Sequence, residues 1–138
     1  MPSSSNPKTK GLARRLVEHE ASPLPADQVS PVFRVCDTLR EPLSELVGMA
    51  GFRSLLSRAL VLSHGQARWL KAVHVSRNGT MEGLEEAHAH LAPDEIAEGE
   101  MFLVANILGL LLIFIGEDLT LWLVTEAWKN RGLEDVHF

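Results

Sequence analysis

The most apolar segment of the chain is FLVANILGLLLIFIG at residues 102–116, and LTLWLV follows it at residues 119–124. Such a segment is either a membrane span or the central helix of a small hydrophobic core. A span needs about 20 consecutive apolar residues, whereas Asn106 interrupts this segment and Glu117 and Asp118 follow it. The sequence therefore favours a buried core helix, and membrane insertion is the less favoured alternative.

The flanks of this segment predict one long helix from Pro93 to about Trp128. Proline is favoured at the first helical position, and Asp94 and Glu95 complement the positive end of the helix dipole. Lys129 places a cation at the opposite end. We expect the remaining helices to pack around this one, because their own apolar faces need a partner.

Three further helices are predicted ahead of it, at residues 10–21, 31–47 and 52–63. The second carries apolar residues at spacings of three and four, which is typical of one buried helix face. Pro42 lies inside it, so we expect a kink or a break near Arg40. The small residues of Gly48 to Gly51 then form a joint before the third helix.

The segment KAVHVSRNGTMEGL at residues 71–84 predicts a short β-hairpin, with a plain loop as the alternative. Val73 and Val75 alternate with more polar residues, and Asn78 and Gly79 are residue types that tolerate a tight turn. A short acidic helix is expected at about residues 85–91. The predicted fold class is mainly α: a compact helical bundle around one apolar C-terminal helix, with this possible hairpin added.

The length of 138 residues corresponds to about one domain. Residues 1–9 combine Pro, Ser, Asn and Lys, so we expect a disordered N-terminal tail followed by a single helical domain at residues 10–138. The only cysteine, Cys36, cannot form an internal disulfide. This favours a reducing, cytoplasmic location, with Cys36 as a small buried residue and not a nucleophile.

Charge is distributed unevenly along the chain. Residues 1–78 hold eleven Lys and Arg against six Asp and Glu, whereas residues 79–138 hold two against twelve, which gives the net charge of -5. Nucleic acid is a poor partner for the acidic half, because phosphate binding needs Lys and Arg. The basic half is expected to fold against the acidic half or to dock on a second copy of it.

Polar and small residues of the long helix fall on one narrow stripe if the helix is straight. Asn106, Gly109, Glu117 and Thr120 lie at offsets that coincide at about 100° per residue. Buried polar groups need partners, and helix 52–63 offers arginines. The sequence therefore predicts a buried or half-buried ion pair of Glu117, and the candidate polar cluster is Arg53, Arg58, Asn106, Glu117 and Thr120. A structural ion pair is favoured over a ligand or catalytic site.

Two sequence motifs of this chain are similar to motifs in a group of other proteins. GFRSLLSRAL stands at residues 51–60 and ILGLLLIFIGEDLTLWLV at residues 107–124. They resemble a group of small bacterial hypothetical proteins that share a G-F-x-x-L-L-x-R-A-L helix and an L-L-G-L-x-x-x-F-I-G-E-x-L-T-L helix, over about residues 35–128. Matching residues are Gly51, Phe52, Arg58, Gly109, Phe114, Gly116, Glu117 and Thr120. The resemblance implies a soluble bacterial domain and carries no known activity.

No residue pattern specifies catalysis, a cofactor or a metal. His88 and His90 stand two apart near several acids, but i and i+2 point to different faces of a helix, so exposed histidines are expected. No loop of the chain has the glycine, lysine and hydroxyl pattern that cradles phosphate. We therefore assign no catalytic, cofactor-binding or metal residue.

The function expected from these observations is a non-enzymatic protein-interaction or regulatory module that self-associates or docks to a partner. The alternative is a small-molecule-binding or enzymatic domain built on Arg53, Arg58 and Glu117. A pocket beside Glu117 would favour the alternative, whereas an exposed apolar patch would favour the interaction module.

Overall fold

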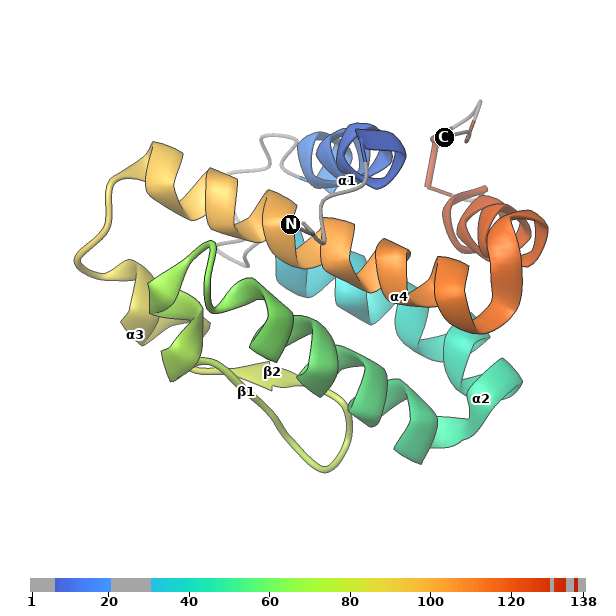
Figure 1. Ribbon diagram of the computed structural model, residues 1–138, viewed down its shortest axis with the longest axis horizontal. Helices are drawn as coiled ribbons and strands as arrows, with labels where there is room; N and C mark the ends of the chain where they lie inside the picture. Colours follow the sequence, from blue (N-terminus) through green and yellow to red (C-terminus); the bar gives the residue numbers. More distant parts are fainter. Residues whose placement is uncertain (1–6, 21–30, 130, 134–135, 137–138) are drawn as a thin grey trace.

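The computed structural model describes residues 7–20, 31–129, 131–133 and 136, and it confirms a mainly α fold (Figure 1). The predicted tail therefore lies largely outside the described residues. Residues 7–9, the last three of the predicted tail, contradict the prediction: a helix begins at Pro7, and the Thr9 side chain is fully buried. The elements in chain order are α1 (Pro7–Glu20), α2 (Pro31–Ser63), the 3-10 helix η1 (Arg68–Ala72), β1 (His74–Val75), β2 (Met81–Glu82), α3 (Leu84–His88) and α4 (Pro93–Trp128).

Helix α4 crosses the middle of the molecule, with α1 on one side of it and α2 on the other (Figure 1). Its start at Pro93 is as predicted, and the Ala92 amide donates a hydrogen bond to Glu95 Oε1 (3.1 Å). Its core-facing side chains are fully or almost fully buried: Leu103, Val104, Ile107, Leu108 and Leu111. The apolar C-terminal helix is therefore the centre of the core.

Both long helices bend sharply at a glycine. Gly48 in α2 has φ 81° and ψ 162°, and Gly116 in α4 has φ 85° and ψ 169°, so the two kinks have almost the same backbone conformation. This combination of φ and ψ is accessible to essentially glycine alone. The two bends lie at the same end of the molecule, on the right of Figure 1.

The kink or break expected near Arg40, next to Pro42, is wrong, because the backbone there stays helical. Helix α2 continues through Pro42, and Gly48 alone among its residues has a non-helical backbone. Proline in a helix interior costs about 3 kcal/mol through its missing donor and its ring. Leu39 and Leu43, on either side of it, are almost fully buried, and burial of two leucines contributes enough to offset that cost.

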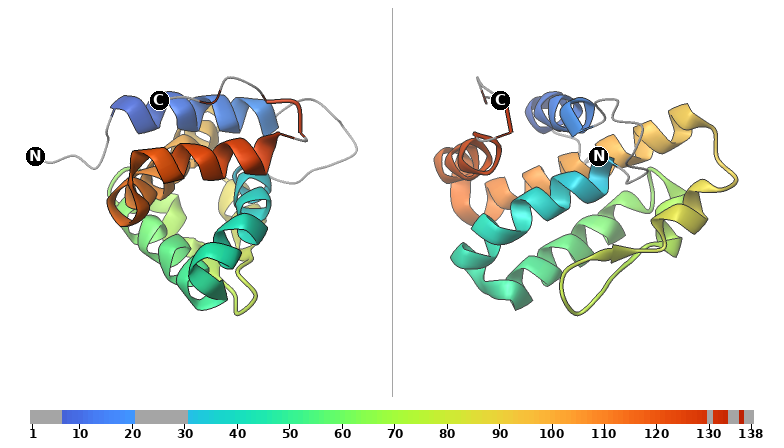
Figure 2. Two further views of the ribbon diagram at one scale, coloured as in Figure 1. Left: turned by 90° about the vertical axis from the view of Figure 1, so that its right-hand side faces the viewer. Right: turned by 180° about the vertical axis from the view of Figure 1, so that it is seen from behind.

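The β-hairpin is confirmed. Strands β1 and β2 pair in antiparallel register, with His74 opposite Glu82 and Val75 opposite Met81. The turn closes through the Ser76 amide, which donates to the Thr80 carbonyl oxygen (2.8 Å). The hairpin packs beside the second half of α2 (Figure 2), as a two-stranded unit must in water.

The kinks predict different outcomes for glycine substitutions within one helix. Neither Gly109 nor Gly116 has an atom within 4 Å of an added Cβ, but only Gly116 has a positive φ. Gly116→Ala should therefore lower the free energy of unfolding by about 1–3 kcal/mol. Gly109→Ala should be neutral or stabilise by up to about 1 kcal/mol. Urea denaturation measures both, and equal effects of the two substitutions would contradict a glycine-dependent kink.

Candidate functional site

Asn106 is the one residue of the predicted polar cluster that has a buried hydrogen-bond network. Its Nδ2 donates to Ser63 Oγ (2.8 Å) and to Gln66 Oε1 (3.2 Å), while the Ser63 hydroxyl donates to the Ala59 carbonyl oxygen (2.8 Å). These contacts tie the end of α2 to the middle of α4. The network satisfies a buried amide and is structural.

Glu117 is exposed, so the prediction that it is buried or half-buried is wrong. Arg58 is also exposed, and no ion pair between Glu117 and either Arg53 or Arg58 exists within the part of the chain that the structure describes. The cause is the kink: a stripe drawn at 100° per residue assumes a straight helix, and Gly116 redirects the second segment. Thr120 is fully buried, and its Oγ1 has no hydrogen-bond partner among the described residues.

A buried carboxylate that the sequence did not reveal joins the two ends of the described chain. Glu20, 4% exposed, ends α1. Its Oε2 accepts hydrogen bonds from Trp128 Nε1 (3.0 Å) and Arg131 Nε (3.1 Å), and its Oε1 accepts one from an Arg131 terminal nitrogen (2.7 Å). The Arg131 carbonyl oxygen also lies 2.7 Å from His19 Nε2. These contacts form a two-point clamp between α1 and the end of α4.

The clamp controls the ionisation of Glu20. Burial raises the pKa of this carboxyl group, but the hydrogen bonds from Arg131 and Trp128 outweigh burial and hold the pKa below its usual range. The carboxylate is therefore charged at neutral pH. Its bidentate contact with a guanidinium is the geometry in which charge-assisted hydrogen bonds are strong.

His88 is not an exposed side chain as predicted. Its ring packs edge-on against Trp69, with ring centroids 5.1 Å apart, and its Nε2 lies 3.8 Å from Oε2 of the buried Glu100. Burial lowers the pKa of His88. His90, by contrast, is exposed as predicted. Among the described residues, no three His, Cys, Asp or Glu side chains gather to hold a metal ion.

Cys36 is a buried core residue, as the sequence indicated. Burial raises the pKa of its thiol to about 12, with smaller contributions from neighbouring charges. The reactive thiolate is therefore scarce at neutral pH, and nucleophilic chemistry at this position has no support.

A mostly apolar cavity of about 460 Å³ lies between α2 and α4 near the two kinks. Helices α2 and α4 both contribute to its walls, which consist of Leu43, Val47, Gly51, Ser54, Leu55, Arg58, Leu111, Phe114 and Ile115. Glu117 does not line it. The left view in Figure 2 looks onto this end of the molecule, along which the second segment of α4 runs.

Large apolar side chains are exposed near the two kinks, on the side away from the hairpin. We call them together the apolar end surface: Leu46, Val47, Ile113, Phe114, Leu119 and Trp122. All of them lie within a few residues of Gly48 or Gly116. Ile113 is 78% exposed and Phe114 is 63% exposed. A concentration of exposed apolar side chains at one end of a small protein indicates an interaction site.

Comparisons of the chain with protein-family models, with curated proteins and with solved structures found no match.

The Glu20 clamp predicts a pH-dependent loss of stability. Because the pKa of Glu20 is lowered on folding, its contribution is complete above the ordinary carboxyl pKa of 4.5 and is lost as the pH falls through the lower folded-state value. At neutral pH, Glu20→Gln should destabilise by roughly 2–3 kcal/mol, less than a fully buried pair, because Arg131 is partly exposed.

Denaturation of wild type and Glu20→Gln across acid and neutral pH measures this contribution. The difference between the two proteins should shrink as the pH falls below 4.5. Glu18→Gln, at an exposed position of the same helix, is the control and should match wild type. A difference that stays constant with pH would show that the Glu20 charge contributes nothing.

Proposed function

We propose that this protein is a non-enzymatic, cytoplasmic interaction module that forms a two-fold dimer through the apolar end surface. The observation that carries the proposal is the mostly apolar cavity near the kinks together with the exposed side chains of that surface. The alternative, a ligand or catalytic site at Arg53, Arg58 and Glu117, loses its support because these residues do not come together.

A second copy of the chain is the occupant that this surface fits best. In a two-fold dimer the same patch meets itself, so the patch has to carry both a projection and a hollow. Ile113 is a projection, because it is 78% exposed and does not line the cavity. The cavity, which opens on the face of α4 that carries Leu111, Phe114 and Ile115, is the hollow, and its apolar walls can accept an aliphatic side chain from the partner copy.

Charges at the edge of the surface are arranged in the same self-complementary way. Arg58 lines the cavity from α2, and the exposed Asp118 lies in the first turn of α4 after Gly116. A two-fold arrangement can bring Arg58 of each copy opposite the acidic turn of the other. Complementary charges at the edge of an interface fix how the two copies are oriented more than they raise the affinity between them.

A membrane is the competing partner for this surface. Among the described residues, α2 and α4 are long and apolar enough to cross a membrane by length and composition alone, which is weak evidence. The apolar window of α4 is 61% buried inside the protein, whereas that of α2 is 33% buried. The apolar part of α4 that carries no charged residue, residues 101–115, spans about 22 Å at 1.5 Å per residue, short of the roughly 30 Å hydrocarbon layer. These facts favour a protein partner.

The proposed dimer predicts a substitution-specific loss of self-association. In sedimentation experiments the wild-type mass should rise towards that of a dimer with increasing concentration. Ile113→Glu should remain monomeric and folded, because a buried unpaired charge at the centre of an interface costs several kcal/mol. Val61→Glu is the matched control: Val61 is 63% exposed, but it lies about 20 Å along α2 from Gly48 at 1.5 Å per residue.

Val61→Glu should associate like wild type. A wild-type protein that stays monomeric at all accessible concentrations would contradict the proposal. So would a monomer that sediments with lipid vesicles unless Ile113 is replaced, since the surface would then serve a membrane.

A further inference from the structure

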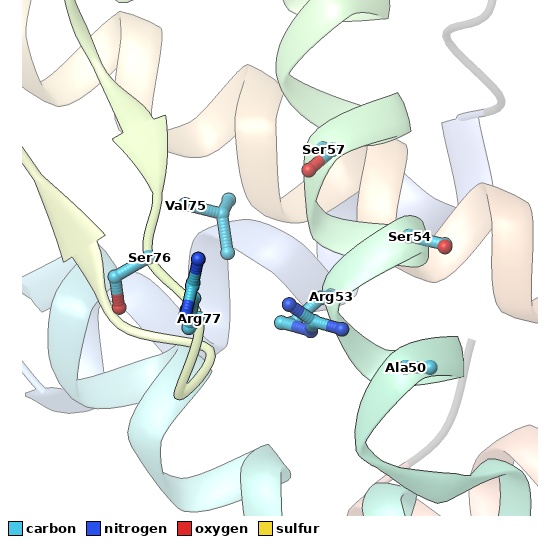
Figure 3. A pocket seen from close by; sticks show the side chains of 7 residues that line it. All are labelled: Ala50, Arg53, Ser54, Ser57, Val75, Ser76 and Arg77. Atoms are coloured by element: carbon cyan, nitrogen blue, oxygen red, sulfur yellow. The ribbon is translucent and has the colours of Figure 1, made fainter.

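A second cavity lies on the other side of α2, between this helix and the β-hairpin (Figure 3). It has a volume of about 480 Å³, within the range typical of small-molecule sites. Its walls consist of Ala50, Arg53, Ser54, Ser57, Val75, Ser76 and Arg77. The helix and the hairpin each contribute one arginine, and no described carboxylate lines the cavity.

The two guanidinium groups occupy the space between the helix and the hairpin, as Figure 3 shows. Arg53 is half-buried, and its Nε is shielded from solvent without a hydrogen-bond acceptor. The ion pairs within the described residues include neither Arg53 nor Arg77. A shielded donor without an acceptor is rare and calls for an explanation, and two like charges lining one cavity repel unless an anion lies between them.

The hydroxyl groups around the cavity have different roles. The Ser76 hydroxyl stays within the hairpin turn: it donates to Asn78 Oδ1 (2.5 Å) and accepts from the Thr80 amide (3.2 Å). No such contact engages the Ser57 hydroxyl among the described residues, and Figure 3 shows it on the side of α2 that faces the hairpin. Ser57 is therefore available to donate to a bound oxyanion, while Ser76 holds the turn that presents Arg77.

We propose that this cavity binds the phosphate group of a small soluble phosphorylated compound, held between Arg53 and Arg77. A guanidinium offers two parallel donors, and two guanidiniums on opposite walls need an anion with at least four acceptor positions on different sides. A tetrahedral phosphate has these positions. A single carboxylate has only two oxygens, both in one plane, so it can fully satisfy the paired donors of only one guanidinium group. The remaining volume, beside Val75 and Ala50, accommodates a small organic portion.

This site is independent of the proposed dimer, although Ser54 lines both cavities. It uses the side of α2 that faces the hairpin, whereas the dimer surface uses the side that faces α4. Arg53 thus belongs with Arg77 and not with Glu117.

The test is a titration with inorganic phosphate and glycerol 3-phosphate, followed by amide chemical shifts in NMR spectra. The resonances of residues 50–57 and 75–77 should shift and saturate, and acetate should bind at least about tenfold more weakly. Arg77→Gln should reduce the phosphate affinity about tenfold or more, because it removes a charge-assisted bidentate contact. Arg77 is exposed in a turn, so this variant should fold. Arg53→Gln should have the same effect.

Arg14→Gln, at an exposed position of α1, is the matched control and should bind like wild type. The same titration with the Ile113→Glu variant separates the phosphate site from the proposed dimer. This variant should bind phosphate with the wild-type affinity, whether or not the wild-type protein dimerises. Absence of saturable binding, or undiminished binding by Arg77→Gln, would overturn the assignment. Binding to vesicles that contain phosphatidic acid, without binding of either soluble phosphate, would also overturn it.

Discussion

The apolar surface of α4 has to be covered on several sides, and this constraint organises the whole molecule. Residues 103–111 are too apolar to face water, and burial of each large aliphatic side chain contributes about 1.5–3 kcal/mol. Helix α1 and both segments of α2 supply the cover. The two long helices fit around one core only because each bends back at a glycine, α2 at Gly48 and α4 at Gly116. The same bends leave the apolar end surface exposed.

The sequence predicts most of the helices and the hairpin because those elements are specified locally. Spacings of three and four, Pro93 with its acidic first turn, and Asn78-Gly79 between alternating residues are all visible in a short window. The kinks are less visible. In the sequence, Gly116 looks like any other small residue within a helix, and only the structure shows its positive φ. A prediction that assumes a straight helix at Gly116 therefore misplaces Glu117.

The candidate site was harder to predict because its contacts are distant in sequence. Glu20 and Arg131 are 111 residues apart, and no local pattern links them. The sequence correctly predicts that Asn106 is a buried polar residue, but its partners are Ser63 and Gln66 and not an arginine. The charge of Arg53 makes it a candidate site residue in the sequence, yet its neighbour across the cavity, Arg77, lies in the hairpin turn. Sequence identifies unusual side chains, whereas their pairing depends on how the helices bend.

The central functional claim is that the apolar end surface binds the same surface of a second copy. Paramagnetic relaxation between copies tests it most directly: isotope-labelled wild type is mixed with unlabelled Thr125→Cys protein that carries a spin label at this exposed position of α4. The buried Cys36 should remain unlabelled. If the two copies meet through the apolar end surface, the amides of Val47, Leu55 and Phe114 should broaden in the labelled copy. Broadening confined to the hairpin, residues 74–82, or no broadening at any residue would contradict it.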